Sequence, residues 1–474
     1  MVFLWPLVAR FVNAYRGARV NRFGIATLLR TRLARSVAPF FPSLRPKTGF
    51  HFSDCALGSA CEHNSGKPMI HYMTTQGVGD AWVGNELRGV AKAGIPFRLH
   101  ALVPPQSTYF TSDDIATFNR ETQLIYPLSF VAAFLAVLAA PVRFGPRTFV
   151  ALANSLFGKR ESFKIRLTGL WHFAVACHWA AKMRDEDISL IHSQWIHSAG
   201  TVAMFGAWLL GKPFSFTGHA ADLFRNRAAL HDKIQRAEFI ICISEFHRQF
   251  FLKNGARPEQ LHIVYCGIDT SHFTPKRRQR PEGEPLHILS AGRLVEKKGF
   301  DILINACGML RERGYDFRCT IAGSGPLEAP LRQQISDMGL GDQIAMTGEA
   351  LKQEHIPDFM YSGDIFCLHC VWAADNDVDG LPQMLMEAMA CGLPSVSTRL
   401  VGIPDLCIDE ETGLLTDPGD TEALADALMR LGDDADRAQF LADSAHRHLT
   451  KVFDIETCLE PLFRQYRAKL ETSQ

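Results

Sequence analysis

The chain places two cations where they could bind phosphate groups. Arg293 and Lys298 follow the apolar run Leu286–Ala291, and Gly292 supplies a tight turn at its end. A guanidinium presents a planar fork of donors and an ammonium a point charge, so together they suit a diphosphate. Ion pairing with Glu296 or other neighbours is the alternative explanation that the residues leave open.

A second group of polar residues precedes a predicted helix at Gln383–Cys391. This loop consists of Asp379, Gly380, Leu381 and Pro382. A loop that opens into a helix presents free N–H groups and the positive helix end, which favours an anion. Glu387 follows Asp379 by eight residues, among apolar neighbours. We expect Asp379 to reach a sugar hydroxyl at the helix mouth, and Glu387 to bind a more distant polyol such as a ribose, because a buried carboxylate needs a partner.

These residues belong to a pattern of short apolar runs that alternate with helical segments. In the first half the expected strands are Met69–Thr74, Pro96–Val103, Ile188–Ser193, Pro213–Thr217, Glu238–Ile243 and Leu261–Val264, and the helices Ala81–Ala93, His197–Leu210 and Glu245–Asn254. In the second half the strands are Leu286–Ala291, Phe317–Ala322, Gln343–Thr347, Asp364–His369 and Pro394–Thr398, with helices Phe300–Arg313, Glu328–Met338 and Gln383–Cys391. Alternation of this kind predicts an α/β fold of two doubly wound, Rossmann-like domains, with a ligand between the carboxyl ends of their sheets.

The length and the charge distribution of the chain agree with two domains of opposite net charge. The 474 residues are 47% apolar and 21% charged, which argues against a disordered, fibrous or polytopic membrane protein. Lys and Arg total 50, as do Asp and Glu, so a uniformly basic nucleic-acid binder is excluded. The balance hides a division: residues 1–280 hold 34 bases and 17 acids, and residues 281–474 hold 16 and 33. The basic half should meet an anionic partner.

The predicted boundaries follow from these patterns. They are a basic N-terminal extension over 1–68, a first Rossmann-like domain over 69–272 with an apolar and basic insert at about 125–180, a linker over 273–285, a second Rossmann-like domain over 286–452, and a C-terminal helix over 453–474 that returns toward the first domain.

The insert predicts contact with an anionic membrane surface. Thr122–Val142 contains no charge, but Pro127 and Pro141 bracket it. Leu128–Ala140 would form a helix of only about 20 Å, short of a hydrocarbon core of about 30 Å. Aromatic and basic residues alternate after it, which favours a helix lying in the membrane interface. An internal helix of the first domain is the alternative.

The motifs resemble those of the retaining glycosyltransferases of family 4, which have the GT-B fold. Gly292-Arg293 with Lys298-Gly299 matches the family's GR-x4-KG stretch, and Glu387-Ala-Met-Ala its EAMA-type helix. Asp379 stands where the family's E-x7-E motif has its first glutamate. The segment Phe214–Phe224 resembles the branch that builds exopolysaccharides of the colanic-acid type.

The resemblance implies transfer of a sugar from a nucleoside-diphosphate sugar, with retention, to a saccharide or polyprenyl-linked saccharide. Arg293, Lys298 and the amides of Gly380–Pro382 would stabilise the leaving diphosphate, and Glu387 would hold the ribose. Asp379 and His219 would lie at the donor sugar. Gly292, Gly380, Leu381, Pro382 and Gly325 complete the expected substrate-binding set. No cofactor, metal or protein base is expected, and the protein would be cytoplasmic and peripheral at the inner face of the plasma membrane of a bacterium.

Other functions remain open from the sequence. A nucleoside-diphosphate-sugar epimerase would use the same fold, and a non-catalytic sugar-nucleotide-binding protein would tolerate Asp379 in place of glutamate. A dinucleotide oxidoreductase is disfavoured, since neither Gly77-x-Gly79 nor Gly323-x-Gly325 completes the six-residue fingerprint.

Overall fold

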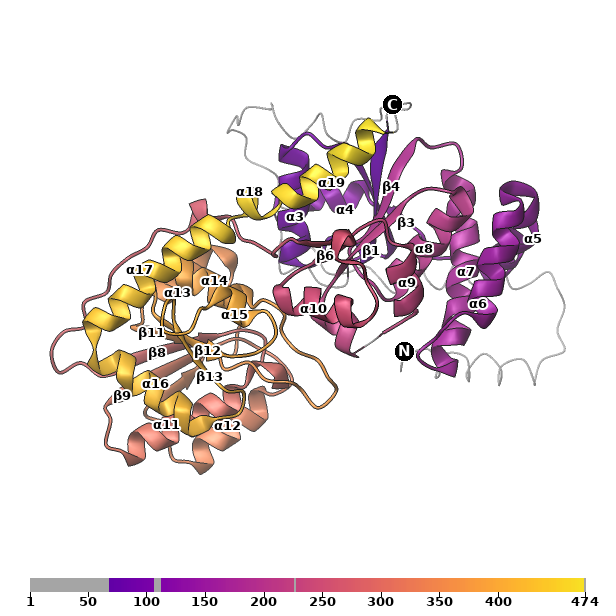
Figure 1. The fold of residues 1–474 in the computed structure, drawn as a ribbon. Helices are drawn as coiled ribbons and strands as arrows, with labels where there is room; N and C mark the ends of the chain where they lie inside the picture. The colour runs from indigo at the N-terminus through magenta and orange to yellow at the C-terminus, as the bar shows by residue number, and fades with distance from the viewer. Residues whose placement is uncertain (1–67, 106–111, 226, 473–474) are drawn as a thin grey trace, which may run out of the picture. The chain divides into compact units, whose positions relative to one another are not determined.

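The computed structural model describes residues 68–105, 112–225 and 227–472. All but the last residue of the predicted basic extension lies outside these residues. Figure 1 shows the fold, with helices on both faces of two separate sheets.

The first sheet contains seven strands among the described residues, in the order β3-β2-β1-β4-β5-β6-β7, and all neighbours are parallel. The strands are β1 (Met69–Gln76), β2 (Phe97–Val103), β3 (Gln123–Leu124), β4 (Ile188–Ser193), β5 (Phe214–Gly218), β6 (Ile240–Cys242) and β7 (Leu261–Ile263). All six residues of β4 are buried, as expected of a central strand covered by helices on both faces. The strand order reverses between β1 and β4, which makes this the switch point of the sheet.

The second sheet repeats the arrangement with six described strands in the order β10-β9-β8-β11-β12-β13. They are β8 (Leu286–Ala291), β9 (Phe317–Ala322), β10 (Ile344–Met346), β11 (Ile365–Cys367), β12 (Ser395–Thr398) and β13 (Leu414–Thr416). All neighbours are again parallel, and the order reverses between β8 and β11. The predicted α/β class with two doubly wound domains is confirmed.

Helices connect the strands of each sheet. In the first domain they are α3 (Ala81–Lys92), α4 (Asp113–Glu121), α5 (Phe130–Phe144), α6 (Pro146–Phe157), α7 (Phe163–Met183), α8 (Ser198–Leu210), α9 (Leu230–Arg236) and α10 (Glu245–Lys253), with a π-helical turn η1 at Ala221–Arg225 and 3₁₀ turns at Pro258–Gln260 and Thr270–His272. In the second they are α11 (Phe300–Glu312), α12 (Glu328–Asp337), α13 (Ile356–Tyr361), α14 (Gln383–Ala390), α15 (Ile403–Leu406), α16 (Thr421–Asp433) and α17 (Ala435–Val452), with 3₁₀ turns at Glu296–Lys298 and Gln353–His355.

The predicted insert forms three helices, α5, α6 and α7, which pack on one another beside α8 (Figure 1). Small residues such as Ala133, Ala136 and Ala140 face inward from α5 and allow close helix contact. The large apolar side chains point outward instead: Phe130 is 80% exposed, Val142 92% and Phe157 82%. None of the helices in the described ranges is long and apolar enough to cross a bilayer.

The last helices carry the chain from the second domain back to the first. After α17, α18 (Ile455–Cys458) contacts α3, and α19 (Glu460–Glu471) packs against β1, β4 and β7. The buried ring of Tyr466 lies 5.8 Å from that of Tyr72 and 5.6 Å from that of His192. The C-terminal segment is thereby part of the first domain's core.

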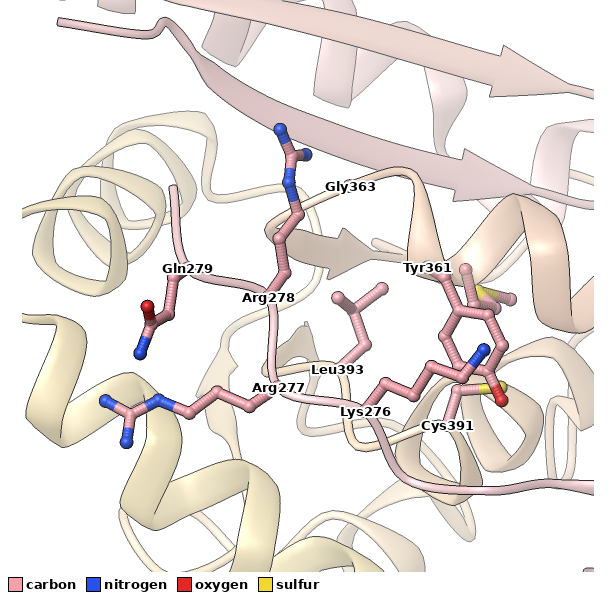
Figure 2. Close-up of a pocket in the computed structure, with 9 residues that line it drawn as sticks. Lys276, Arg277, Arg278, Gln279, Tyr361, Gly363, Cys391 and Leu393 are labelled. Atoms are coloured by element: carbon pink, nitrogen blue, oxygen red, sulfur yellow. The ribbon is translucent and has the colours of Figure 1, made fainter. Parts of the chain in front are cut away.

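The predicted linker is held against the second domain. Arg278 donates a hydrogen bond to the carbonyl oxygen of Ser362 at 2.7 Å, and the Tyr361 hydroxyl donates to that of Thr274 at 2.6 Å. Lys276 lies over the Tyr361 ring at 3.9 Å. These side chains border a pocket beside the linker, which Figure 2 shows.

Candidate functional site

Two loops meet at the switch point of the second sheet, one after β8 and one after β11. The Val371 N–H donates to the carbonyl oxygen of Lys297 at 3.0 Å, and the Ala374 N–H donates to Oε1 of Glu296 at 2.9 Å. Because neighbouring parallel strands end at the same edge, both loops emerge side by side. The sequence motifs that are about ninety residues apart thus form one structure.

A largely buried group of charges, with side chains 12–14% exposed, joins the same two loops. Nζ of Lys297 lies 2.9 Å from Oδ1 of Asp379, and Lys298 pairs with Oδ2. Lys297 also lies 3.2 Å from Asp377. Burial opposes ionisation of Asp379, but the ammonium groups of Lys298 and Lys297 outweigh it and hold the pKa of that carboxyl well below its usual range. Lys298 therefore pairs with Asp379, not with Glu296.

Arg293 is the cation that remains available. Its side chain is exposed, and among the described residues no acidic group lies within ion-pair distance of it. Gly292, the residue before it, directly follows β8, and its N–H donates a hydrogen bond to the carbonyl oxygen of Ala322 at 2.9 Å. The backbone of Gly325 packs so closely on this loop that a Cβ there would lie 2.5 Å from the carbonyl oxygen of Leu294.

Glu387 is a buried carboxyl group with an unused acceptor. The residue is 4% exposed, and its Oε1 accepts a long hydrogen bond from Gln353 at 3.5 Å. Its Oε2 has no partner among the described residues. Burial raises the pKa of Glu387 to about 8. Such a group is available for a hydrogen bond with a ligand hydroxyl.

The loop from Gly380 to Pro382 leads into α14, and no side chain caps the amino end of that helix. Gly380 and Pro382 are buried and Leu381 is half-buried. The first-domain side packs closely here: a Cβ on Gly380 would lie 2.8 Å from Cδ1 of Ile243 and 3.7 Å from Cβ of Ala220.

His219 is the residue before Ala220, so the structure brings its loop beside Gly380. His219 follows β5, and its N–H donates to Oδ1 of Asp222 at 2.9 Å. Its Nε2 is buried without a partner among the described residues. Burial, with smaller effects of His247 and His192, lowers the pKa of His219 to about 3, so the imidazole is neutral near pH 7.

Further contacts join the two sheets' loops. The Glu245 N–H donates to Oδ2 of Asp405 at 2.7 Å, and Arg225 lies 2.7 Å from Asp375. The Phe224 and Trp372 rings lie 5.3 Å apart. The pocket in Figure 2 is a separate feature, because none of the predicted site residues lines it.

Comparison with known proteins agrees with this arrangement. Residues 136–272 match the family described as Glycosyltransferase Family 4, and residues 273–448 match Glycosyl transferases group 1. The chain belongs to the family 4 glycosyltransferases with the GT-B fold. The two matches meet at residue 272, where the first domain passes into the linker.

Relatives of this glycosyltransferase chain include amylovoran biosynthesis glycosyltransferase AmsK of Erwinia amylovora, 38% identical over 52% of this chain and 61% of the relative. The putative colanic acid biosynthesis glycosyltransferase WcaL of Escherichia coli is 38% identical over 41% of this chain and 47% of its own length. The matched region thus spans about half to three-fifths of these relatives.

Solved structures share the GT-B fold of this family 4 chain. HepE of Anabaena, determined in complex with UDP, superposes with a TM-score of 0.62 at 15% identity, over 84% of this chain and all of HepE. Sucrose-phosphate synthase of Thermosynechococcus elongatus gives a TM-score of 0.61 at 18% identity, over 85% of this chain and all of that one.

Sequence reasoning missed two charged residues that shape this candidate site. Lys297 shares Asp379 with Lys298, although only the second lysine belongs to the recognised motif. Asp222 holds the loop of His219, yet it was noted only as part of a similar segment. Adjacent lysines before a glycine and an acid three residues after a histidine were the available signals.

We expect Asp379→Ala to destabilise the second domain strongly. Removal of one partner of a buried ion pair leaves the other charge uncompensated and costs about 3–5 kcal/mol. Urea denaturation monitored by circular dichroism would measure the change. Glu410→Ala is the control, because Glu410 pairs with Arg430 and Arg437 at the surface and its loss should cost much less. Equal losses in both variants would contradict the buried-cluster interpretation.

We expect Glu387→Gln to change how stability depends on pH. The folded-state pKa of Glu387, about 8, lies above its ordinary value of 4.5, so the folded protein retains a proton that the unfolded chain releases between these values. The free energy of unfolding of the wild type therefore falls with rising pH in this window, and the glutamine variant lacks that contribution.

Urea denaturation at pH 5 and at pH 8.5, without nucleotide, measures this effect. The stability of Glu387→Gln relative to the wild type should rise between the two pH values. Glu354→Gln, at an exposed position of the same domain, should show no such rise. Parallel pH dependence of Glu387→Gln and the wild type would mean that the carboxyl is not buried and protonated.

Proposed function

We propose that this protein is a retaining glycosyltransferase that moves a sugar from a nucleoside-diphosphate sugar to a saccharide acceptor. The observation that carries the proposal is the direct pairing of Lys298 with Asp379, which joins the Gly292–Gly299 loop to the loop that opens α14. The guanidinium of Arg293, the ammonium group of Lys298 and the amino end of α14 therefore lie at the switch point of the second sheet. Such a set suits a diphosphate better than a neutral ligand.

In the proposed reaction the bond between the sugar C1 and the diphosphate oxygen breaks, and its electron pair stays on that oxygen. Arg293, Lys298 and the amides at Gly380–Pro382 stabilise the charge that develops there. The acceptor hydroxyl oxygen bonds to C1 on the same face, and its proton passes to the departing diphosphate. These cations supply the charge stabilisation without a metal ion or cofactor.

The other residues then hold the donor. The free Oε2 of Glu387 forms a hydrogen bond with a ribose hydroxyl. Asp379 holds Lys298 in place through its carboxylate and lies at the mouth of α14, where the donor sugar would bind. His219, neutral near pH 7, contributes a hydrogen bond at the sugar rather than a charge.

The relatives suggest the biological setting. AmsK and WcaL are named for amylovoran and colanic acid biosynthesis, and HepE was determined with UDP and with UDP-glucose. We propose that this chain extends a bacterial exopolysaccharide or other cell-surface saccharide on a polyprenyl-linked acceptor.

Arg293→Ala should abolish stabilisation by the donor nucleotide and reduce turnover at least tenfold, because the exposed guanidinium has no role in the fold. A thermal-shift panel of UDP, GDP, ADP and dTDP sugars identifies the nucleotide class that raises the melting temperature of the wild type. Arg318→Ala, at an exposed position on β9, is the control and should leave binding unchanged.

The same panel separates the competing functions. Unchanged turnover in Arg293→Ala would refute the assigned site. Formation of an epimer from the donor alone, without acceptor, would identify an epimerase. Nucleotide binding without any turnover would indicate a non-catalytic sugar-nucleotide-binding protein.

We also propose that the α5–α7 insert lies on an anionic membrane. The exposed apolar side chains form one stripe on each of the first two helices and continue at the start of α7. They are Phe130, Val131, Phe134, Leu135, Leu138 and Val142 on α5, Phe149, Val150, Leu156 and Phe157 on α6, and Phe163 and Leu167 on α7. Exposed apolar surface of this extent favours an interaction site.

Charge complementarity favours lipid as the partner. Arg143, Lys159 and Lys164 are exposed on these helices and their connection. Glu161 is the only acid between residues 122 and 184, and its carboxylate accepts hydrogen bonds from the N–H groups of Ala229 and Leu230 at 2.8 and 2.9 Å. The surface therefore presents aromatic and basic side chains without a free negative charge, as expected at a lipid interface. This location corresponds to the cytoplasmic face of the plasma membrane.

Replacement of Phe130 and Phe157 by serine should reduce binding to liposomes of phosphatidylglycerol and phosphatidylcholine by an order of magnitude, because these rings would lose their insertion into the lipid. Flotation of the full chain measures binding. Phe440→Ser, at a residue 51% exposed on α17, is the control.

Two further measurements test the role of the basic residues and the possibility of self-association. Arg143→Gln with Lys159→Gln should weaken binding to anionic liposomes more than to neutral ones. Unchanged flotation in both sets of variants would refute the membrane surface. Concentration-dependent dimerisation that the serine variants abolish would instead identify the surface as an interface between two copies of the chain.

A further inference from the structure

Four aromatic rings gather at the carboxyl ends of β1, β4 and β5. Trp82 lies at the start of α3, Trp195 and His197 follow β4, and His219 follows β5. The Trp82 ring lies 5.3 Å from that of Trp195 and 3.9 Å from that of His219. Trp195 lies 5.2 Å from His219 and 5.5 Å from His197. We call these four residues the aromatic cluster.

The aromatic cluster differs from the packing of a hydrophobic core. Trp82, Trp195 and His197 are only half-buried, whereas Trp179 in the same domain is buried and its indole N–H donates to Nδ1 of His100 at 3.2 Å. Aromatic side chains at such a position retain surface that a ligand can cover.

The imidazoles of the aromatic cluster also lack partners. Nε2 of His219 and Nδ1 of His197 are buried, and neither has a hydrogen-bond partner in the described parts of the chain. Buried polar atoms are nearly always hydrogen-bonded in folded proteins. Burial lowers the pKa of His197 to about 4, with a smaller contribution from Lys233, so both rings are neutral near pH 7 and can donate and accept hydrogen bonds.

We propose that the aromatic cluster is an acceptor subsite that binds one pyranose ring of the saccharide acceptor. A pyranose has apolar faces of C–H groups and a rim of hydroxyls. The indoles of Trp82 and Trp195 cover an apolar face, and the free Nδ1 of His197 bonds to a rim hydroxyl, while Nε2 of His219 remains for the donor sugar. This assignment rests on the glycosyltransferase function proposed above and names the part of the first domain that recognises the acceptor.

The cluster is held in place by one buried carboxylate. Oδ2 of Asp222 accepts a hydrogen bond from the N–H of Ile196 at 2.5 Å, and Oδ1 accepts from that of His219 at 2.9 Å. The loops after β4 and β5 are thus fixed relative to each other. Nζ of Lys233 adds a second tie, because it donates to the carbonyl oxygen of His197 at 3.2 Å. A rigid aromatic surface binds a ligand at a lower entropic cost than a mobile one.

The cluster also lies beside the proposed donor residues. Asp80, two residues before Trp82, is buried enough to raise the pKa of its carboxyl, and the positive charge of Arg293 opposes that rise. On the other side of the cluster, Ala220 lies next to Gly380. A saccharide on the indoles would therefore present a hydroxyl toward the site of the donor diphosphate.

The test uses Trp82→Leu and Trp195→Leu in the full chain. The probes are methyl α- and β-D-glucopyranoside, galactopyranoside and mannopyranoside, followed by saturation-transfer NMR and by titration. We expect at least one of them to bind the wild type, and each variant to weaken that binding about tenfold. Trp208→Leu, which removes an indole that packs against Arg236 on another part of the domain, should not weaken it.

Two further readouts separate a binding role from a structural one. Trp82→Phe should retain most of the glycoside binding, since it keeps an aromatic face. Thermal stabilisation by UDP should be the same in all tryptophan variants as in the wild type, because the residues proposed to bind the nucleotide and its diphosphate lie in the second domain. Loss of this response would indicate a structural role and overturn the subsite.

The possible outcomes distinguish the two proposals. If no glycoside binds the wild type, or if both leucine variants bind as well as the wild type, the subsite is wrong even when donor binding and transfer are intact. If a glycoside binds through the tryptophans but no nucleotide sugar stabilises the protein, the subsite stands as a saccharide site and the glycosyltransferase function is wrong.

Discussion

Parallel strand pairing is the constraint on which the site depends. Every described strand in both sheets runs in the same direction as its neighbours, so all the carboxyl ends of a sheet lie at one edge. Residues that are distant in the chain then emerge together wherever the strand order reverses. Lys298 and Asp379 meet after β8 and β11, and Trp82, Trp195 and His219 meet after β1, β4 and β5. In each sheet, these residues lie close together because they follow parallel strands that end at the same edge.

Burial raises the pKa of both carboxyl groups of the E-x7-E-type motif, but only one of them has cations that reverse this effect. Asp379 lies between two ammonium groups, which hold its pKa below the usual range despite burial. Glu387 has only a long hydrogen bond from Gln353, and burial raises its pKa to about 8. The first carboxylate organises cations for the donor diphosphate, and the second remains available for a hydroxyl. The aspartate at position 379 has a shorter side chain than glutamate, yet it is long enough to pair with Lys298.

The two domains contribute different chemistry to the proposed reaction. The second domain supplies Arg293, Lys298 and the amino end of α14, which match an anionic leaving group. The first supplies neutral imidazoles and indoles, which match a saccharide, and an exposed apolar insert with basic residues beside it. The basic excess of the first half of the chain thus includes Arg143, Lys159 and Lys164 on the insert, far in sequence from the aromatic cluster. A lipid-linked acceptor would use both surfaces.

Much of this architecture was predictable because local patterns specify it. The runs Ile188–Ser193, Leu286–Ala291 and Phe317–Ala322 coincide with β4, β8 and β9, since continuous apolar segments bounded by turns favour buried parallel strands. The short strands β3 and β13 escaped prediction, whereas β6, β7, β10 and β11, of three residues each, lie within longer predicted runs.

The sequence by itself determined the fold class, most of the strands and their order, and the motifs from which Arg293, Lys298 and Glu387 are predicted to bind the donor. Only the tertiary structure decided which charges are paired and which are free. It assigned Lys297 and Lys298 to Asp379, left Arg293 exposed, and left Nε2 of His219 beside two indoles with no partner from the described part of the chain. The reason is that pairing depends on distances of a few ångströms between residues far apart in the chain, which composition and spacing do not contain.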